Sequence, residues 1–236
     1  MPEVGRVKKA GLVGGIGPES TLDYYKGING GYRARMGGGD NPPLIIDSLN
    51  LAEMYDLAAN KQWPAFTTRL VGSVKNLVAG GAEFAAMAAN TAHIVFEAVQ
   101  RQSPIPLISI VEETCKAAQI KKCKSVVIFG TAFTMSSGLY TDAFAAYGIE
   151  ASVPTAAEQA TIHGIIFPHL QEGIVLTDEK CTMLQIANRM IAERQADALI
   201  LGCTELPLII KEQDLDVLVL DTTQIHIDAI VDYLLS

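Results

Sequence analysis

The chain has 236 residues, of which 49% are hydrophobic and 19% are charged, so it can bury the core of one large domain or two small ones and is not of the disordered class. Its 18 Lys and Arg against 26 Asp and Glu give a net charge of −8, the wrong sign for a surface that neutralises phosphates. No apolar run approaches the ~20 residues that cross a bilayer. We therefore expect neither a nucleic-acid partner nor a membrane span.

The beginning of the chain and its cysteines bear on the compartment. Arg6, Lys8 and Lys9 precede an apolar stretch that is rich in glycine and stops at Pro18, unlike the apolar region of a signal peptide. We therefore expect a cytoplasmic protein. The chain has four cysteines: Cys115, Cys123, Cys181 and Cys203. They show neither a C-x-x-C pair nor the spacing of a zinc site, so we expect no disulfide and no structural metal.

Short apolar segments alternate with longer amphipathic segments along the chain, which predicts a parallel sheet covered by helices. The predicted strands are 9–13, 43–47, 84–88, 107–110, 125–129, 150–153, 198–201 and 217–220. The predicted helices between them include 63–78, 91–100, 136–147, 162–170, 178–195 and 224–234.

The second half of the chain repeats the pattern of the first. Residues 12–15 precede a similar segment, 128–131, by 116 residues, and residues 89–91 precede 203–205 by 114. A third pair of segments is separated by 112 residues, namely 106–109 and 218–221. The regular spacing indicates a tandem duplication.

The duplication predicts an α/β protein of two similar lobes, each a four-stranded, mainly parallel sheet flanked by helices, with a pseudo-twofold axis relating them. We assign 1–113 to the N-terminal lobe, 114–224 to the C-terminal lobe, and 225–236 to a C-terminal helix that packs on the N-terminal lobe. Ligands of open α/β sheets bind at the carboxyl ends of the strands. We therefore expect a site in a cleft between the strand ends of the two lobes.

The first motif is the glycine-rich segment 11–20, which follows a predicted strand and opens a predicted helix. It fits a dinucleotide-binding turn poorly, because Ser20 stands where the third glycine belongs and Asp47 lies later than the ~20 residues expected for a ribose-binding acid. Two interpretations are left: a tight turn before a capped helix, or backbone amides near Gly15 and Ile16 that line a site for a small carboxylate.

The second motif is Cys203, which directly follows a predicted strand. Backbone amides of the following turn can lower the pKa of such a thiol below its free value of ~8.5, so Cys203 is the best candidate for a reactive group. We expect the other three cysteines to be inert core residues. The equivalent position of the first lobe is Ala89, followed by Asn90 and Thr91. Like Thr204, these two carry short hydrogen-bonding side chains that suit either a carboxylate ligand or N-capping.

Two threonines and the four histidines are the other candidates for functional residues. Thr131 and Thr134 follow the strand that corresponds to the first glycine turn, and they suit either an anion or the cap of a helix that starts near residue 135. No histidine has a metal-ligand partner at useful spacing, so we expect a surface or helix-face role for each. The four histidines are His93, His163, His169 and His226.

Four segments taken together resemble the aspartate/glutamate racemase superfamily: 14–21, 90–93, 130–134 and 202–205. The resemblance spans nearly the whole chain and is closest to the aspartate racemase branch, which carries Thr-Glu after its second cysteine where glutamate racemases carry Thr-His. It implies an isomerase without pyridoxal phosphate, metal or other cofactor, with two cysteines on opposite faces of the substrate. It also implies a homodimer and a small amino acid or dicarboxylate as the ligand.

The resemblance assigns roles to residues of this chain. Cys203 would transfer the α-proton, and Glu205 would orient or assist it. Hydrogen bonds to the substrate carboxylate would stabilise the carbanion-like intermediate. The implied substrate-binding residues are Gly15, Ile16, Asn50, Asn90, Thr91, Thr131, Thr134 and Thr204.

The chain departs from the family at Ala89, which stands where the first catalytic cysteine belongs and can neither accept nor donate a proton. Loss of a positioned acid or base typically removes ~10²- to 10⁴-fold in rate. Ala89 is either an engineered replacement or a feature of a natural one-cysteine branch; alternatively, water or Thr91 serves that face. Two other functions stay open: a one-cysteine decarboxylase of the same superfamily, and a carboxylate-binding protein without activity.

A second departure is Thr161, near the position where aspartate racemases usually carry a lysine. No arginine lies near residues 47–50 either. Because a second carboxylate is usually recognised by a cation, aspartate, glutamate and less acidic amino acids are all open as substrates.

Overall fold

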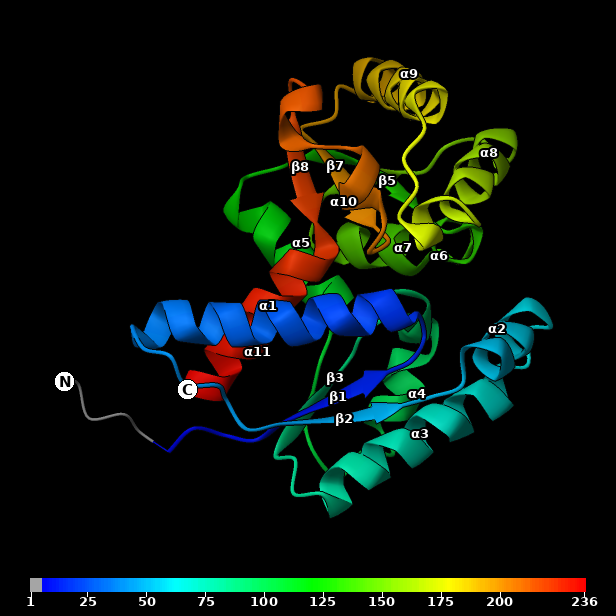
Figure 1. Cartoon of the computed structure of the whole chain (residues 1–236). Coiled ribbons are helices and arrows are strands. Elements are labelled where there is room, and N and C mark those ends of the chain that lie inside the picture. The colour runs from blue at the N-terminus through cyan, green and yellow to red at the C-terminus, as the bar shows by residue number, and fades with distance from the viewer. Residues whose placement is uncertain (1–5) are drawn as a thin grey trace. The chain divides into compact units, whose positions relative to one another are not determined.

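Figure 1 shows the computed structural model of the chain, which describes residues 6–236. The chain divides into two compact units. Unit 1 comprises the residues up to Ile110 together with His226–Ser236, and unit 2 comprises Val111–Ile225. Both units are layered α/β structures, and each is described by itself.

Within residues 6–236, each unit has one four-stranded sheet in which all neighbouring strands are parallel. The sheet of unit 1 has the order β2-β1-β3-β4, with β1 (Ala10–Gly14), β2 (Leu44–Ser48), β3 (Phe84–Met87) and β4 (Leu107–Ile108). The sheet of unit 2 has the order β6-β5-β7-β8, with β5 (Ser125–Gly130), β6 (Glu150–Ser152), β7 (Ala198–Gly202) and β8 (Leu218–Asp221). The two orders correspond strand for strand, and the predicted class of two parallel α/β sheets is confirmed.

Helices cover both faces of the sheet in unit 1. They are α1 (Pro18–Met36), α2 (Leu51–Ala59), α3 (Trp63–Ala79), the 3₁₀ helix η1 (Thr91–Val95), α4 (Phe96–Gln100) and the later part of α11 (Thr222–Leu235). Successive residues of β1 point to opposite faces. Leu12 packs with α1 and α11, whereas Val13 packs with α3. Because both faces are buried, the strands are apolar without alternation, as parallel strands usually are.

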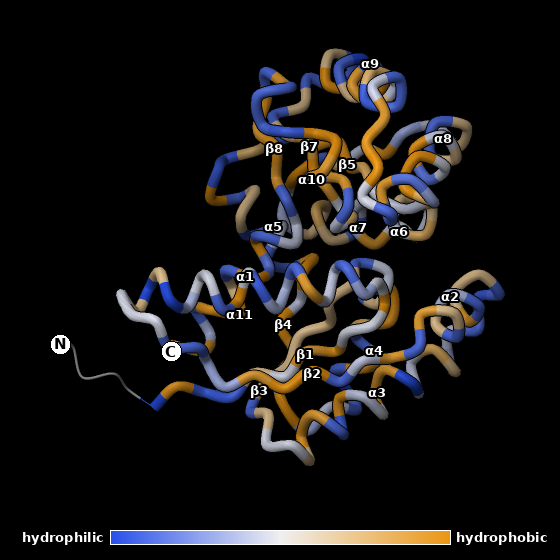
Figure 2. Tube along the Cα trace, viewed as in Figure 1, coloured by the Kyte–Doolittle hydropathy of each residue, from blue (hydrophilic) through white to orange (hydrophobic). Residues whose placement is uncertain are grey.

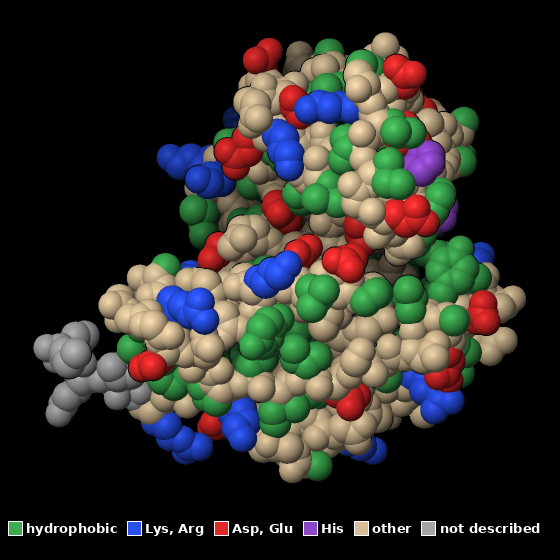
Figure 3. Space-filling model, in the orientation of Figure 1, with side chains coloured by type: hydrophobic (Ala, Val, Ile, Leu, Met, Phe, Trp, Pro, Cys, Tyr) green, Lys and Arg blue, Asp and Glu red, His purple; other side chains and the backbone are tan. Residues whose placement is uncertain are grey.

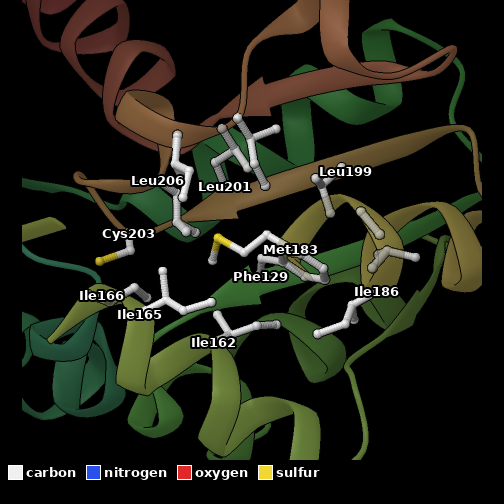
Figure 4. Close-up of a cluster of buried hydrophobic side chains, with 14 of the residues drawn as sticks. Phe129, Ile162, Ile165, Ile166, Met183, Ile186, Leu199, Leu201, Cys203 and Leu206 are labelled. Carbon is white, nitrogen blue, oxygen red and sulfur yellow. The ribbon is translucent and has the colours of Figure 1, made fainter. Parts of the chain in front are cut away.

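Unit 2 has the same layered plan. Its helices are α5 (Ile110–Ile120), α6 (Ala132–Ser136), α7 (Leu139–Ala146), α8 (Ala156–Ile166), η2 (Leu170–Glu172), α9 (Thr177–Arg194), α10 (Leu206–Ile209) and η3 (Glu212–Asp214). One core cluster joins Phe129 and Leu201 of the sheet to Ile166 of α8 and Met183 of α9. Figure 4 shows Cys203 at the border of this cluster, beside Ile166.

Three predicted helices differ from the structure. The predicted helix 136–147 is interrupted, because Gly138 takes a left-handed conformation (φ 78°) between α6 and α7. The predicted helix 162–170 instead begins at Ala156 behind a capping box of Thr155 and Glu158, and it ends before Pro168. The predicted helix 91–100 begins as the 3₁₀ helix η1. The helical pattern of the sequence did not include residues 156–161, because apolar residues do not recur there at helical spacing.

Figure 2 shows that apolar residues concentrate in the strands and on the inner faces of the helices of each unit. Along the residues that the structure describes, no helix is both long enough and apolar enough to cross a bilayer.

Candidate functional site

The glycine turn after β1 is closed by its own hydrogen bonds. Gly15 has a φ of 82°, and a Cβ there would lie 2.2 Å from the carbonyl oxygen of Leu49, so no other residue fits. The Gly15 amide donates to Oγ1 of Thr21 (2.9 Å), whose hydroxyl donates to the carbonyl of Gly17 (3.0 Å). The turn therefore uses the Gly15 amide internally, as a tight turn does, but Gly17 at the start of α1 makes no side-chain capping hydrogen bond, so the predicted cap is wrong.

The neighbouring strand ends of unit 1 carry Asn50 and Ile16. Asn50 is exposed and caps α2 by accepting from the amide of Glu53 (3.1 Å). Ile16 is half-buried and packs against the core on the α3 side of the sheet. The amide of Leu49 donates to the carbonyl of Gly14 (3.0 Å), which holds the two strand ends together.

The turn after β3 holds Ala89 in a buried position, 8% exposed. The Ser20 hydroxyl donates to the carbonyl of Ala88 (2.6 Å), and Nδ1 of His93 lies 2.9 Å from the carbonyl of Ala89. Asn90 is buried at the start of η1, but its side chain makes no capping hydrogen bond. The capping interpretation of Asn90 is therefore wrong.

Two histidines near this turn are buried, which corrects the predicted surface or helix-face role. His93 Nε2 accepts from the amide of Ile110 (3.2 Å), so its proton is on Nδ1. His226 Nε2 faces the carbonyl of Ile108 (3.0 Å), so it carries the proton, and Nδ1 accepts from the hydroxyl of Tyr24 (2.7 Å). Burial lowers the pKa of His93 to about 4, and burial together with the neighbouring His93 lowers the pKa of His226 to about 3. Both rings are neutral structural elements of unit 1.

The turn after β7 carries a buried thiol and carboxylate. Cys203 and Glu205 are each 8% exposed, and the Cys203 thiol donates to Oε2 of Glu205 (2.8 Å). The Thr204 hydroxyl donates to the same oxygen (2.8 Å). Burial, followed by the negative charge of Glu205, raises the pKa of Cys203 well above its usual value. The expected lowering of this pKa is therefore wrong, because burial and Glu205 outweigh the amides of the turn.

Thr131 and Thr134 lie beside this turn. Thr131 Oγ1 accepts from the amide of Thr134 (3.3 Å), and the two hydroxyls lie 3.2 Å apart. The capping interpretation is confirmed, although the capped helix, α6, begins at Ala132 rather than near residue 135. Gly130 pairs with Gly202 in the sheet, so Thr131 and Cys203 leave neighbouring strands at the same level. Neighbouring strands are ~4.8 Å apart, which brings both side chains to one edge of the sheet.

The predicted residues thus form one group in each unit. Unit 1 collects Gly15, Ile16, Asn50, Ala89, Asn90 and the half-buried Thr91 at the ends of its strands, and unit 2 collects Thr131, Thr134, Cys203, Thr204 and Glu205. Three rings also pack together beside Thr131, namely Phe133, His163 and Phe167, and of these the sequence indicated His163 alone, as a surface or helix-face residue. The pattern of apolar residues along the chain does not predict this contact between rings, because Phe133 belongs to α6 whereas His163 and Phe167 belong to α8 and its end.

The described residues contain neither a cluster of metal ligands nor a second reactive cysteine at a strand end. Among residues 6–236, no group of three or more His, Cys, Asp or Glu side chains is arranged to hold a metal ion. Cys115 and Cys123 are buried as expected, and burial raises the pKa of both thiols. Cys181 is exposed on α9, so the predicted core role is wrong for it.

Comparison with known proteins gives consistent matches over most of the chain. The sequence model of the Asp/Glu/Hydantoin racemase family matches residues 13–230. A broad specificity amino-acid racemase of Bacillus subtilis (strain 168) is 25% identical over 221 residues, which cover 90% of this chain and 92% of that protein. A glutamate racemase of Koribacter versatilis (strain Ellin345) is 35% identical over 147 residues, 59% of this chain, but the match spans only 47% of that protein. The crystal structure of an aspartate racemase homologue from Pyrococcus horikoshii OT3 is similar with a TM-score of 0.86 and 33% identity, covering 96% of this chain and 99% of that one.

Proposed function

Because the chain belongs to the Asp/Glu/Hydantoin racemase family, we propose that it is an isomerase, a cofactor-independent amino-acid racemase of the aspartate/glutamate type. The proposed chemistry is transfer of the substrate α-proton by the thiol of Cys203. One observation carries it: at the carboxyl end of β7, the buried thiol donates a hydrogen bond to the buried carboxylate of Glu205 (2.8 Å). A thiol and a base in contact are what proton transfer at carbon needs.

Each proton has a defined path in this proposal. In the removal step, Glu205 takes the thiol proton of Cys203, and the thiolate then accepts the α-proton of the substrate. In the return step, the thiol donates its proton to the carbanion and recovers one from Glu205. Since the pKa of Cys203 is raised, the resting thiol keeps its proton, and removal depends on Glu205.

Neutral donors are proposed to hold the substrate carboxylate and to stabilise the charge that develops on it. Hydroxyl and amide side chains can do this without a cation, because several short donors can share one carboxylate. In unit 2 the proposed donors are Thr131, Thr134 and Thr204, which stand at the strand ends beside Cys203. For unit 1 the resemblance implies Asn90 and Thr91, with Gly15, Ile16 and Asn50 as the further predicted contacts.

Because Ala89 stands where a second thiol is expected, only one face of the substrate would meet an acid or base. A single thiol can remove and return a proton on one face of the substrate, which exchanges the proton without inverting the centre. Inversion needs a second group, and Ala89 offers none. We therefore propose rapid exchange of one enantiomer and slow inversion, with water or Thr91 as the weak second donor.

A decarboxylase is the second candidate, because the raised pKa of Cys203 keeps a proton ready for a carbanion. Loss of carbon dioxide from a malonate-type substrate would leave such a carbanion, and the thiol would protonate it. A carboxylate-binding protein without activity is the third candidate, and it would need neither the thiol nor Glu205.

A homodimer and a cytoplasmic location stay predictions from the sequence. On the face shown in Figure 3, hydrophobic side chains gather over α1, where Leu22 and Tyr25 are each 47% exposed. Such a patch supports an interface between two copies of the chain.

The test follows α-proton exchange by NMR in heavy water with each enantiomer of a panel of amino acids, and measures inversion separately by chiral chromatography. We expect exchange in the unchanged protein and a loss of ~10²- to 10⁴-fold in Cys203→Ser. Cys181→Ser is the matched control, because its thiol is exposed on α9. Equal exchange in Cys203→Ser would contradict the proposal. Absence of exchange combined with release of carbon dioxide from a substituted malonate would favour the decarboxylase.

A further inference from the structure

Three rings, here called the ring cluster, lie beside the proposed thiol in unit 2: Phe133 of α6, His163 of α8 and Phe167 at the end of α8. The centroids of Phe133 and His163 are 6.1 Å apart with the ring planes at 78°, and those of His163 and Phe167 are 4.8 Å apart at 55°. All three side chains are half-buried, so a partly exposed apolar surface stands at this place.

The ring cluster belongs to the edge of the sheet that carries Cys203. Nδ1 of His163 accepts from the amide of Ala132 (3.5 Å), the residue that directly follows Thr131. Phe167 packs against the core cluster that includes Cys203, and Figure 4 shows Ile166, its neighbour in the chain, beside that thiol. The rings therefore flank the hydroxyl and thiol groups that the proposed reaction uses.

The ring cluster carries no charge of its own. Because Nδ1 of His163 accepts a hydrogen bond, its proton is on Nε2, and burial lowers the pKa of the ring. The acidic groups at this edge are Glu205 and Asp221, and Asp221 accepts from the amides that begin α11.

The basic residues of unit 2 lie outside the segments that follow its strands, and Lys211, whose side chain reaches one of these segments, is held there by a backbone carbonyl. The segments that follow its strands contain no Lys or Arg: 131–137, 153–155, 203–208 and 222–225. Lys211 donates to the carbonyl of Pro207, and Lys180 pairs with Asp214. In unit 1 the corresponding segments 15–21, 49–52, 88–95 and 109–111 also contain no Lys or Arg.

We infer that the substrate is an amino acid with an uncharged, apolar side chain, which packs on the ring cluster, with Phe133 and Phe167 as the residues that determine specificity. The inference rests on the proposed function and names its substrate class. A second carboxylate at this edge would lose water near two acidic groups without gaining a cation, whereas an apolar side chain would cover apolar rings.

The test compares kcat/KM for α-proton exchange in heavy water with both enantiomers of phenylalanine, leucine, methionine, alanine, aspartate and glutamate. We expect the three large apolar amino acids to exceed aspartate and glutamate by ~10-fold or more, since one methylene in an apolar site is worth ~10- to 200-fold. Phe133→Ala and Phe167→Ala should each lower kcat/KM for those three by ~10-fold and leave alanine nearly unchanged.

Two further variants distinguish a loss of substrate contacts from a loss of folding. Phe133→Leu keeps an apolar side chain and should retain most of the preference, while Tyr147→Ala removes a half-buried ring at the opposite, amino edge of the sheet and should change nothing. Faster exchange of aspartate or glutamate than of all apolar amino acids would overturn the inference and leave the racemase proposal standing. Absence of exchange with every amino acid would overturn both.

Discussion

The turns that follow β3 and β7 occupy the same place in their sheets, after the third strand in each order, yet they differ in chemistry. In unit 1 the side chains around Ala89 bind backbone carbonyls, through the Ser20 hydroxyl and the His93 ring. In unit 2 the side chains of Cys203 and Glu205 bind each other. The duplicated fold is thus kept in both units, while a hydrogen-bonded pair of a thiol and a carboxylate is found in unit 2. Topology therefore sets the position of each turn in its sheet, whereas the chemistry of the turn depends on two or three side chains.

Adding a thiol to the first turn is the change with the largest expected effect. We expect Ala89→Cys to raise the rate of inversion by ~10²-fold or more, because it supplies a second acid or base. Ala89 is a buried member of the core cluster on the α3 side of the sheet, and cysteine is the smallest side chain that brings a thiol there. The measurement is inversion against α-proton exchange in the same sample.

Ala88→Cys is the matched control for that variant. Ala88 is the neighbouring residue, but it packs on the opposite face of the sheet, with α1 and α11. It should give no gain in inversion. Equal gains in both variants, or fast inversion by the unchanged protein, would show that Ala89 is not the missing group.

Acid should weaken unit 1 through its buried histidines. The pKa values of His93 and His226 are about 4 and about 3 in the fold, against 6.5 in the unfolded chain. Below pH 6.5 the unfolded chain therefore binds protons that the folded chain does not, so stability is complete above pH 6.5 and falls as the pH approaches 4 and then 3. At pH 5 the difference of 1.5 pH units is worth ~2 kcal/mol for each ring.

Urea unfolding at pH 7 and pH 5 measures this loss. His226→Gln should unfold more easily at pH 7 but should lose ~2 kcal/mol less than the unchanged protein between the two pH values. An equal loss in both proteins would mean that other groups, such as carboxylates, carry the acid sensitivity.

Much of the fold could be predicted from the sequence, because parallel strands that are buried on both faces can be recognised as short, continuous apolar segments. All eight predicted strands lie within two residues of the observed ones. The segment 156–161 shows the limit, since its first helical turns are defined by the cap at Thr155 rather than by an apolar period.

The candidate site could be predicted only in part. The end of a predicted strand indicated Cys203 as a candidate, with Glu205 two residues later. The sequence does not show that the Glu205 carboxylate turns toward the thiol, and this contact, together with burial, raises the pKa of Cys203 instead of lowering it. The burial of His93 and His226 could not be predicted either. Their rings meet at 5.8 Å across 133 residues of chain, a contact that only the tertiary structure creates.

The smallest expected effect concerns the hydroxyls that hold the two strands. In unit 1 the Ser20 hydroxyl donates to the carbonyl of Ala88 (2.6 Å), and in unit 2 the Thr222 hydroxyl donates to the carbonyl of Leu201 (2.9 Å). Both groups are buried, so Ser20→Ala and Thr222→Val should each lower the free energy of unfolding by ~1 kcal/mol. Ser136→Ala removes an exposed hydroxyl and should stay within ~0.5 kcal/mol. Equal losses at Ser20 and Thr222 would mean that the two hydroxyls hold their strands alike. A clearly smaller loss at Ser20 would mean that His93 holds the first turn by itself.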